Sequence, residues 1–234
     1  MIKILSWNCQ YEIGKKEGLT SEKMELIAKY DSDVLLIQEC TKREFNRFKR
    51  SFKFRNWYND DLEDSSLGTA ILSDEWEIAF PERFNRNFRY VIPYRLKRGD
   101  RELTLYSVWI KAPFDGSGDY AKVLCEAMDY YRPESGTLVM GDFNVGANDE
   151  HPNRYKELLR KLGSLGLCNA AAGTGYEHAN THWNRGTGKF FQNDYCFCTR
   201  DVSLESFAVP DAGSWVTEGG ATSWAGLSDH CPVC

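Results

Sequence analysis

The sequence predicts an α/β protein built from two packed sheets with helices on their outer faces. Three observations support this fold class. Short apolar runs of strand length recur along the chain, segments with helical spacing lie between them, and a group of strands followed by a helix pair occurs twice. No Pro/Ser-rich linker or low-complexity segment interrupts the 234 residues. We therefore expect a single domain over residues 1–234.

Composition and charge narrow the class of protein. With 42% hydrophobic and 14% aromatic residues, the chain can bury a substantial core. It has no apolar run of the roughly 20 residues that span a bilayer, and its start lacks the zones of a signal peptide, so we expect a cytoplasmic protein that is not bound to membranes. The net charge of −5 gives no global positive field for nucleic acid.

The eight cysteines do not indicate a disulfide framework. Five of them, Cys9, Cys40, Cys196, Cys198 and Cys231, lie in apolar strand-like runs, where we expect reduced and buried thiols. The pairs Cys196/Cys198 and Cys231/Cys234 allow a structural zinc site as an alternative, but their spacing and strand context are unusual for one.

The first elements follow from periodicity and capping. Residues 2–8 alternate and are rich in β-formers, which predicts a strand. Residues 19–30 carry apolar side chains at helical spacing, and Thr20 or Ser21 can cap this helix. Residues 34–40 are almost continuously apolar, as expected of a strand buried on both faces. Thr41 can cap a basic helix over residues 42–49.

The middle of the chain is rich in predicted strands. Residues 97–100, Lys-Arg-Gly-Asp, suit the turn of a β-hairpin. A helix is expected near residues 120–131, followed by a strand over residues 137–143. The expected strands before that helix are 52–58, 69–72, 76–80, 89–96 and 102–111.

The C-terminal part is expected to begin with a helix over residues 154–162, followed by glycine-rich loops around residues 173–188. Strands are predicted at residues 194–199 and 204–209, and residues 229–233 look like the start of a last strand.

Polar residues at the ends of apolar strands are the candidates for chemistry. The predicted strand at residues 137–143 runs into Gly141-Asp142-Phe143-Asn144, and alternation puts Asp142 and Asn144 on one face. A carboxylate beside an amide can orient a water and hold a phosphate oxygen. The same four residues also fit a plain turn.

A second cluster is Ser228-Asp229-His230. Adjacent side chains at a strand start face opposite ways, so one residue can bind a metal while the other meets a substrate. Taken alone, the cluster is equally consistent with an Asp that acts as a capping residue and a His on the protein surface.

Three further polar residues lie at strand boundaries. Glu39 closes the apolar run at residues 35–38, and a charged residue there is costly unless it is paired or bound to a metal. Asn8 ends the first predicted strand and Asp194 begins another. Glu39, Asn8 and Asp229 offer the oxygen ligands that Mg²⁺ prefers, whereas four His residues without a pair at ligand spacing disfavour a zinc centre.

Taken in order, these motifs resemble the endonuclease/exonuclease/phosphatase superfamily, and in particular its small bacterial members related to abasic-site endonucleases and pancreatic-type deoxyribonucleases. The resemblance extends from Asn8 to His230. It implies a four-layer α/β/β/α sandwich of two mixed sheets, with the active site where both sheets end. The motifs that carry it are Trp7-Asn8, Gln38-Glu39, Gly141-Asp142-Phe143-Asn144, Asp194-Tyr195 and Ser228-Asp229-His230.

The resemblance also implies a role for each residue. Glu39 would be the main Mg²⁺ ligand, aided by Asn8 and Asp229, and Mn²⁺ could substitute. Asp142 would align or deprotonate the attacking water and Asn144 would bind the phosphate. His230, paired with Asp194, would stabilise charge on the phosphoryl oxygens. This division suits phosphoryl transfer, which needs an in-line nucleophile and electrostatic stabilisation.

Two positions depart from the family pattern. Trp109 stands where many relatives carry a His or a Tyr, and an indole N–H can donate a hydrogen bond but cannot shuttle protons. Trp109 is therefore either a wall of the substrate pocket or part of the core. Gln10 stands where abasic-site enzymes carry a second carboxylate, so we expect it to contact substrate rather than hold the metal.

The sequence favours a phosphodiesterase or nuclease, acting as a monomer on nucleic acid or nucleotides. Basic runs at residues 42–55 and 83–101 support this, although both could be solvated surface. A phosphomonoesterase or a hydrolase of phospholipids or inositol phosphates is the alternative. A catalytically inactive phosphate-binding module is a third interpretation.

Overall fold

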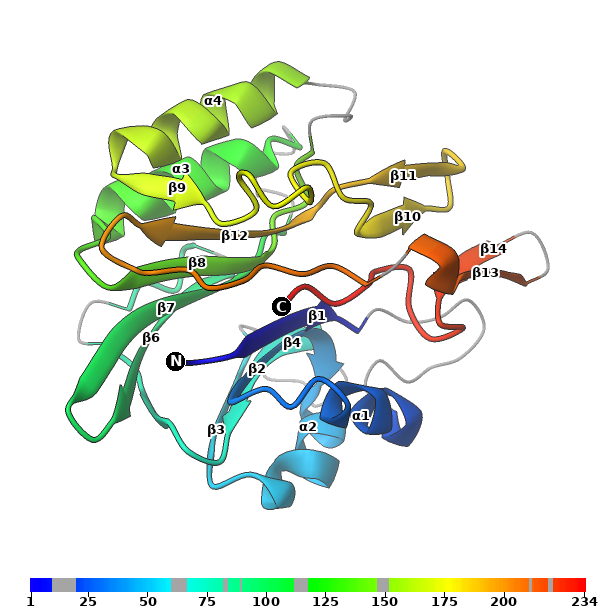
Figure 1. The fold of residues 1–234 in the computed structure, drawn as a ribbon, viewed down its shortest axis with the longest axis horizontal. Helices are drawn as coiled ribbons and strands as arrows, with labels where there is room; N and C mark the ends of the chain where they lie inside the picture. Colours follow the sequence, from blue (N-terminus) through cyan, green and yellow to red (C-terminus); the bar gives the residue numbers. More distant parts are fainter. Residues whose placement is uncertain are drawn as a thin grey trace. The chain divides into compact units, whose positions relative to one another are not determined.

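The computed structural model describes residues 1–9, 20–59, 67–81, 84–88, 90–111, 118–146, 152–210, 212–218 and 221–234. These residues form a mixed α/β fold with four α-helices and two large mixed sheets (Figure 1). They group into two compact units. The first unit contains Met1–Ile78, Thr181–Phe190 and Val209–Cys234, and the second contains Ala79–Asn180 and Phe191–Ala208. A single domain over residues 1–234 stays a prediction.

The first unit is built on a four-stranded sheet in the order β1-β2-β4-β3. Strands β1 and β2 are parallel, so Asn8 and Gln38 are register partners at the same edge. Strands β4 and β3 add to β2 in antiparallel fashion. The strand bounds are β1 Ile4–Asn8, β2 Val34–Thr41, β3 Phe54–Tyr58 and β4 Leu67–Ser73.

The predicted caps start both helices of the first unit. Helix α1, Ser21–Ala28, begins after Thr20, whose side chain accepts a hydrogen bond from the Lys23 backbone N–H. Helix α2, Lys42–Phe48, begins after Thr41 with a capping box formed by Thr41 and Glu44. A short 3₁₀ turn, Lys49–Ser51, follows α2. Because Thr41 is also the last residue of β2, its cap sets where that strand ends.

The second unit is built on a six-stranded sheet in the order β5-β6-β7-β8-β12-β9. Its β6–β7 hairpin turns at Gly99 and Asp100 as predicted, because Arg98 pairs with Arg101 and Gly99 has a φ of 60°. The only parallel pair among the described ladders of this sheet is β7 with β8. The bounds are β5 Glu77–Ala79, β6 Val91–Arg98, β7 Arg101–Trp109, β8 Thr137–Asp142, β9 Leu167–Asn169 and β12 Asp194–Thr199.

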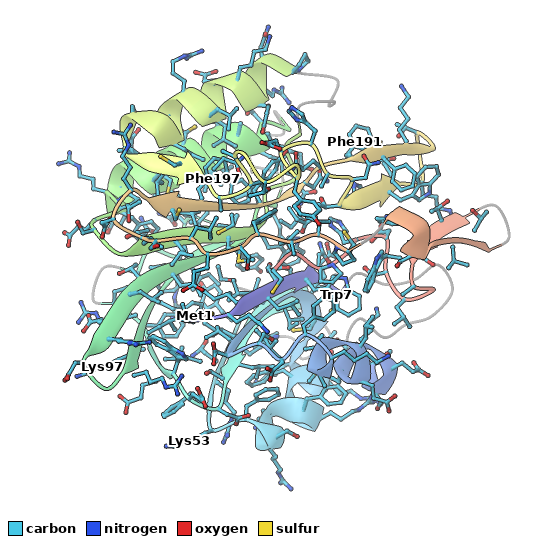
Figure 2. The ribbon with its side chains drawn as sticks, viewed as in Figure 1. Met1, Trp7, Lys53, Lys97, Phe191 and Phe197 are labelled. Atoms are coloured by element: carbon cyan, nitrogen blue, oxygen red, sulfur yellow. The ribbon has the colours of Figure 1, made fainter. Side chains whose placement is uncertain are left out.

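Helices α3, Tyr120–Tyr131, and α4, Pro152–Ser164, pack on this sheet side by side (Figure 1). Their apolar faces and the sheet form one core, which includes Leu124, Met128 and Leu158 from the helices and Phe197 from β12 (Figure 2). This burial holds β7, β8 and β12 firmly, and these are the strands that carry the polar residues described below.

The structure corrects three expectations for the C-terminal part. Residues 204–209 form no strand: Phe207 and Val209 are buried and Leu204 is exposed, so alternation is present without a ladder partner. Residues 229–233 make only isolated bridges, His182 with His230 and Ser6 with Val233. The glycine-rich stretch at residues 173–188 includes a strand that periodicity did not predict, β10, His182–Asn184.

Several other elements had no sequence prediction. They have three or four residues each, which is too short for a periodic pattern to emerge. Hairpin strands β10 and β11 pair with each other, as do β13 and β14. The bounds are β10 His182–Asn184, β11 Lys189–Phe191, β13 Trp215–Glu218 and β14 Ala221–Trp224, with a 3₁₀ turn at Ala212–Ser214; β9 also belongs to this group.

All eight cysteines are free thiols, and the five expected in strands are buried. Burial raises the pKa of the Cys9 thiol to about 12, so it stays protonated near neutral pH. No helix in the described part of the chain has the length and apolar character needed to cross a membrane.

Candidate active site

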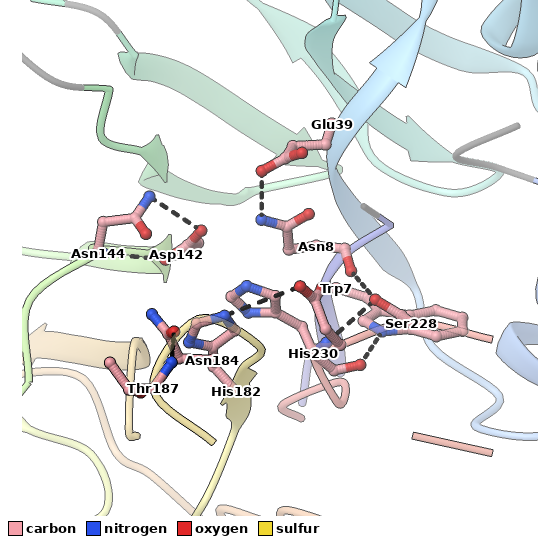
Figure 3. A network of polar contacts seen from close by, with 11 residues as sticks. Trp7, Asn8, Glu39, Asp142, Asn144, His182, Asn184, Thr187, Ser228 and His230 are labelled. Atoms are coloured by element: carbon pink, nitrogen blue, oxygen red, sulfur yellow. Dashed lines mark hydrogen bonds and ion pairs between the residues drawn. The ribbon is translucent and has the colours of Figure 1, made fainter. Parts of the chain in front are cut away.

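Glu39 is placed by a bulge in strand β2. The pairing of β2 with β4 shifts register between Gln38 and Cys40, and Glu39 adopts a φ of 57°. A left-handed conformation is uncommon for a residue other than glycine and costs free energy unless the surrounding structure enforces it. Asn8, at the end of the neighbouring strand β1, donates from Nδ2 to Glu39 Oε1 at 3.0 Å (Figure 3). The bulge therefore brings a carboxylate and an amide together at one edge of the first sheet.

The Ser228-Asp229-His230 segment is fastened to the same end of β1. Ser228 Oγ donates to the Asn8 carbonyl at 2.9 Å and accepts from the His230 backbone N–H at 3.1 Å. The indole N–H of Trp7 donates to the His230 carbonyl at 2.9 Å (Figure 3). Trp7 is fully buried, so this anchor is rigid. The three contacts explain why Asp229 and His230 stay beside Asn8 without a continuous strand.

Strand β10 holds the segment from its other side. The Trp183 backbone N–H donates to the Asp229 carbonyl at 2.8 Å, and the Cys231 N–H donates to the Thr181 carbonyl at 2.9 Å. Asp229 and His230 therefore lie between β1 and β10, and their orientation depends on two segments that are distant in sequence.

His182 is a member of the site that the sequence did not reveal. Its ring stacks on His230 with centroids 4.4 Å apart, and its Nε2 lies 3.8 Å from Asp229 Oδ2. Burial and the nearby His230 lower the pKa of His182 to about 2. His182 is therefore neutral near pH 7, and its approach to Asp229 is a polar contact rather than an ion pair. Its glycine-rich surroundings carry no strand signal that could have indicated it.

In the second unit, Asp142 and Asn144 form a tight local structure at the end of β8. Asp142 accepts from the Asn144 backbone N–H at 2.9 Å and from Asn144 Nδ2 at 3.2 Å (Figure 3). Nδ2 of Asn144 also donates to the Ile110 carbonyl at 2.9 Å. Asn144 has a φ of 50°, which Asn tolerates better than most residues. The predicted pairing of these two side chains is present.

Asp194 lies directly opposite Asp142 in the antiparallel pairing of β12 with β8. Both residues are fully buried, and their carboxylate oxygens lie within 4.8 Å of each other. Two buried carboxylates at this separation repel each other, so placing them together costs stability. Such a pair is typical of a functional site rather than of a structural core.

Trp109 is the register partner of Asp142 on β7. It is only 4% exposed, and its ring stacks on Tyr90 at 5.2 Å with an interplanar angle of 11°. Tyr90 and Trp109 also exchange two backbone hydrogen bonds of 2.9 Å. Trp109 is thus largely packed against Tyr90 at the edge where Asp142 lies.

The predicted residues therefore fall into two groups. Gln10 lies outside the described residues. Two further residues, His182 and Lys111, were not predicted as site residues. Lys111 lies two residues after Trp109. The first unit holds Asn8, Glu39, Asp229 and His230, and the second holds Asp142, Asn144, Asp194 and Trp109.

Comparison with known proteins identifies the family. The model of the Endonuclease/Exonuclease/phosphatase family matches residues 5–230. The chain belongs to this family. It is therefore a hydrolase of phosphate esters. The candidate residues of the first unit and those of the second unit lie near the ends of its strands. Among curated proteins, none matches this sequence.

Solved structures share the fold over the whole chain. The endonuclease domain of TRAS1, a telomere-specific non-LTR retrotransposon, has 17% identity and a TM-score of 0.64, with 100% of this chain and 96% of that one covered. Truncated Caenorhabditis elegans TDP2 has 17% identity and a TM-score of 0.67, with 99% and 95% covered.

A third similar structure is the 3′-5′ exonuclease NExo from Neisseria meningitidis. It has 17% identity and a TM-score of 0.64, with 99% of this chain and 98% of that one covered. The fold of this chain is therefore that of the family, as the sequence predicted.

The residues of the first unit suit a hard divalent cation. Asn8 contributes an amide and Glu39 a carboxylate, and their hydrogen bond holds the two groups side by side at one edge of the sheet. Asp229 adds a carboxylate from the segment fastened beside Asn8. Oxygen donors of this kind fit Mg²⁺ or Mn²⁺ better than Zn²⁺.

Proposed function

We propose that the protein is a Mg²⁺-dependent phosphodiesterase that hydrolyses phosphodiester bonds in nucleic acids or nucleotides, with Mn²⁺ as a substitute. The observation that carries the metal part is the left-handed bulge at Glu39, hydrogen-bonded to Asn8. A strained backbone conformation persists only where the surrounding structure enforces it, and here it places the Glu39 carboxylate beside the Asn8 amide. Glu39, Asn8 and Asp229 would hold the ion, which when bound polarises a phosphoryl oxygen.

The residues of the second unit take the other roles in this proposal. Asp142 orients the attacking water and accepts its proton, while its two hydrogen bonds from Asn144 hold the carboxylate in one orientation. Contact of Asn144 with the phosphate stays a prediction, because both N–H bonds of its amide already donate within the protein, to Asp142 and to the Ile110 carbonyl. His230 stabilises negative charge on the phosphoryl oxygens, and its pairing with Asp194 stays a prediction.

Nucleic acid is proposed as the substrate because two of the similar structures were solved with bound DNA products. Danio rerio TDP2, at 16% identity, was solved in complex with a single-strand DNA product, and NExo with a product DNA hairpin. NExo is also described as a 3′ phosphatase. Hydrolysis of a terminal phosphate monoester is therefore the second candidate activity. The monomeric state and the cytoplasmic location stay predictions.

An activity screen of the purified chain tests the proposal. With Mg²⁺ we expect turnover of single-stranded DNA, plasmid DNA, RNA or bis-p-nitrophenyl phosphate, and loss of turnover with EDTA. Asp142→Asn should reduce the rate by at least about 10³-fold, because it removes the base but keeps the side-chain shape. Its circular dichroism spectrum and Mg²⁺ affinity should match the wild type.

Other outcomes would contradict specific parts of the proposal. Faster turnover of p-nitrophenyl phosphate or inositol phosphates than of any diester would replace the phosphodiesterase with a phosphomonoesterase. Binding of phosphate esters without turnover of any substrate would favour the inactive binding module. A wild-type rate for Asp142→Asn would remove Asp142 from its role.

A further inference from the structure

Lys111 lies at the end of β7 with its ammonium group above two aromatic rings. Its Nζ is 4.7 Å from the ring centroid of Trp109 and 5.2 Å from that of Tyr90. Because side chains two residues apart on an extended chain share a face, Lys111 follows Trp109 on the same side. No sequence motif assigns a role to this lysine, which lies outside both basic runs.

The backbone next to Lys111 is fastened to the Asp142–Asn144 turn. The Ile110 backbone N–H donates to the Asp142 carbonyl at 3.1 Å, and the Ile110 carbonyl accepts from Asn144 Nδ2 at 2.9 Å. Both hydrogen-bonding groups of the residue before Lys111 are thus used to join β7 to this turn. Lys111 therefore leaves the sheet beside Asn144, at the edge that carries Asp142.

The aromatic pair beneath Lys111 is rigid. Tyr90 is fully buried, Trp109 is 4% exposed, and the two residues are joined by stacked rings and by two backbone hydrogen bonds. A cation close to such rings is attracted by their electron-rich faces, which limits the freedom of a normally flexible side chain. An ammonium group held in this way loses less conformational entropy when it binds an anion.

We infer that Lys111 binds a non-bridging oxygen of a backbone phosphate of a nucleic-acid strand, at the sheet edge that carries Asp142. Trp109 and Tyr90 position it. The inference rests on the proposed function, since it assigns a further substrate contact to the same site. A local cation matters here because the chain carries a net charge of −5 and has no general attraction for nucleic acid.

A salt titration of binding tests this contact. Lys111→Met keeps most of the aliphatic stem over the rings and removes only the charge. Lys156→Met is the matched control, because Lys156 is an exposed lysine on helix α4 of the same unit and lies outside both basic runs. The probe is a short fluorescein-labelled single-stranded oligodeoxynucleotide. Binding is measured by anisotropy with Mg²⁺ on the Asp142→Asn background, and probe integrity is checked on a gel.

We expect Lys111→Met to raise the Kd roughly tenfold at low salt, as loss of a charge-assisted hydrogen bond should. The slope of log Kd against log salt concentration should fall by about one, because one phosphate contact is lost. Lys111→Arg should keep both values within about twofold of the parent, since it retains the charge. Thermal unfolding of all variants should remain within a few degrees of the parent.

Three outcomes overturn the inference: no binding of the probe by the parent protein, an unchanged Kd and salt slope in Lys111→Met, or an equal loss in Lys156→Met. A merely structural role would change stability and leave the salt slope unchanged. Failure of the proposed function gives a different result. In that case no phosphate ester is hydrolysed in the activity screen, while Lys111→Met still weakens binding of the probe.

Discussion

Glu39 and Asn144 both have a left-handed backbone, with φ values of 57° and 50°. Such a conformation costs on the order of 1–3 kcal/mol for a residue other than glycine. Glu39 lies at the bulge of β2 and Asn144 lies two residues after the end of β8. The Glu39 side chain is hydrogen-bonded to Asn8 and the Asn144 side chain to Asp142. The strain therefore falls on the residue that we assign to the metal and on the residue that orients Asp142, where orientation matters more than local stability.

The metal role of Glu39 is testable by substitution. Glu39→Gln should raise the Mg²⁺ concentration for half-saturation at least about tenfold, because a charged oxygen ligand is replaced by a neutral one. Isothermal titration calorimetry with Mg²⁺ measures this independently of activity. The matched control is Glu25→Gln on α1, an exposed glutamate in the same unit. An unchanged affinity in Glu39→Gln would remove Glu39 from the metal site.

At the scale of elements, strand ends bring the candidate residues into register. Trp109 on β7, Asp142 on β8 and Asp194 on β12 are register partners across three adjacent strands, so their side chains emerge on one face. Gly141 permits this arrangement. It has a φ of 143°, and a Cβ atom at this position would lie 2.0 Å from the Val108 carbonyl oxygen on β7.

Gly141→Ala should therefore separate β8 from β7. We expect a loss of at least about 2 kcal/mol in the free energy of unfolding, because backbone atoms rather than a flexible side chain must move. Activity should fall with it, since Asp142 is the next residue. Urea denaturation measures the stability. Gly163→Ala on α4, where a Cβ atom meets nothing within 4 Å, is the control and should be neutral or slightly stabilising. Equal stability of both variants would contradict the close approach of β7 to β8.

At the scale of the whole molecule, many buried groups that lose a proton at high pH have raised pKa values. Burial raises the pKa of Cys9, Tyr30 and Tyr131 to about 12 and that of Cys125 to about 11. Their ordinary values are 9.0 for the thiols and 10.0 for the phenols. The folded state holds these protons more tightly than the unfolded state does. The resulting stabilisation is complete below about pH 9 and is lost as the pH rises towards 12.

The free energy of unfolding should accordingly be nearly constant from pH 7 to about pH 9 and should then fall steadily, as measured by urea denaturation at each pH. Cys125→Ala removes one of these groups at a half-buried position and should make the alkaline decline less steep. Stability that stays constant up to pH 11 would show that these side chains ionise as easily in the folded chain as in the unfolded one.

Much of the fold was predictable because its longer elements have clear local signals. Helices α1 and α2 begin after Thr20 and Thr41 as their caps predicted, and β12 has the predicted bounds, Asp194–Thr199. The strands that were not predicted, such as β10, have three or four residues and depend on a neighbouring chain segment for their hydrogen bonds. Residues 204–209 show the converse, because Phe207 and Val209 are buried there although the segment is not assigned to a strand.

The sequence by itself determined the family, and it predicted the residue types of the candidate site and their order along the chain, because each motif is a short local string beside a strand with its own periodicity. Only the tertiary structure decided how these residues are held. The bulge at Glu39, the stacking of His182 on His230 and the position of Lys111 above Trp109 and Tyr90 all depend on partners outside the local motif. Such contacts are set by strand register and packing, which leave no trace in a local pattern.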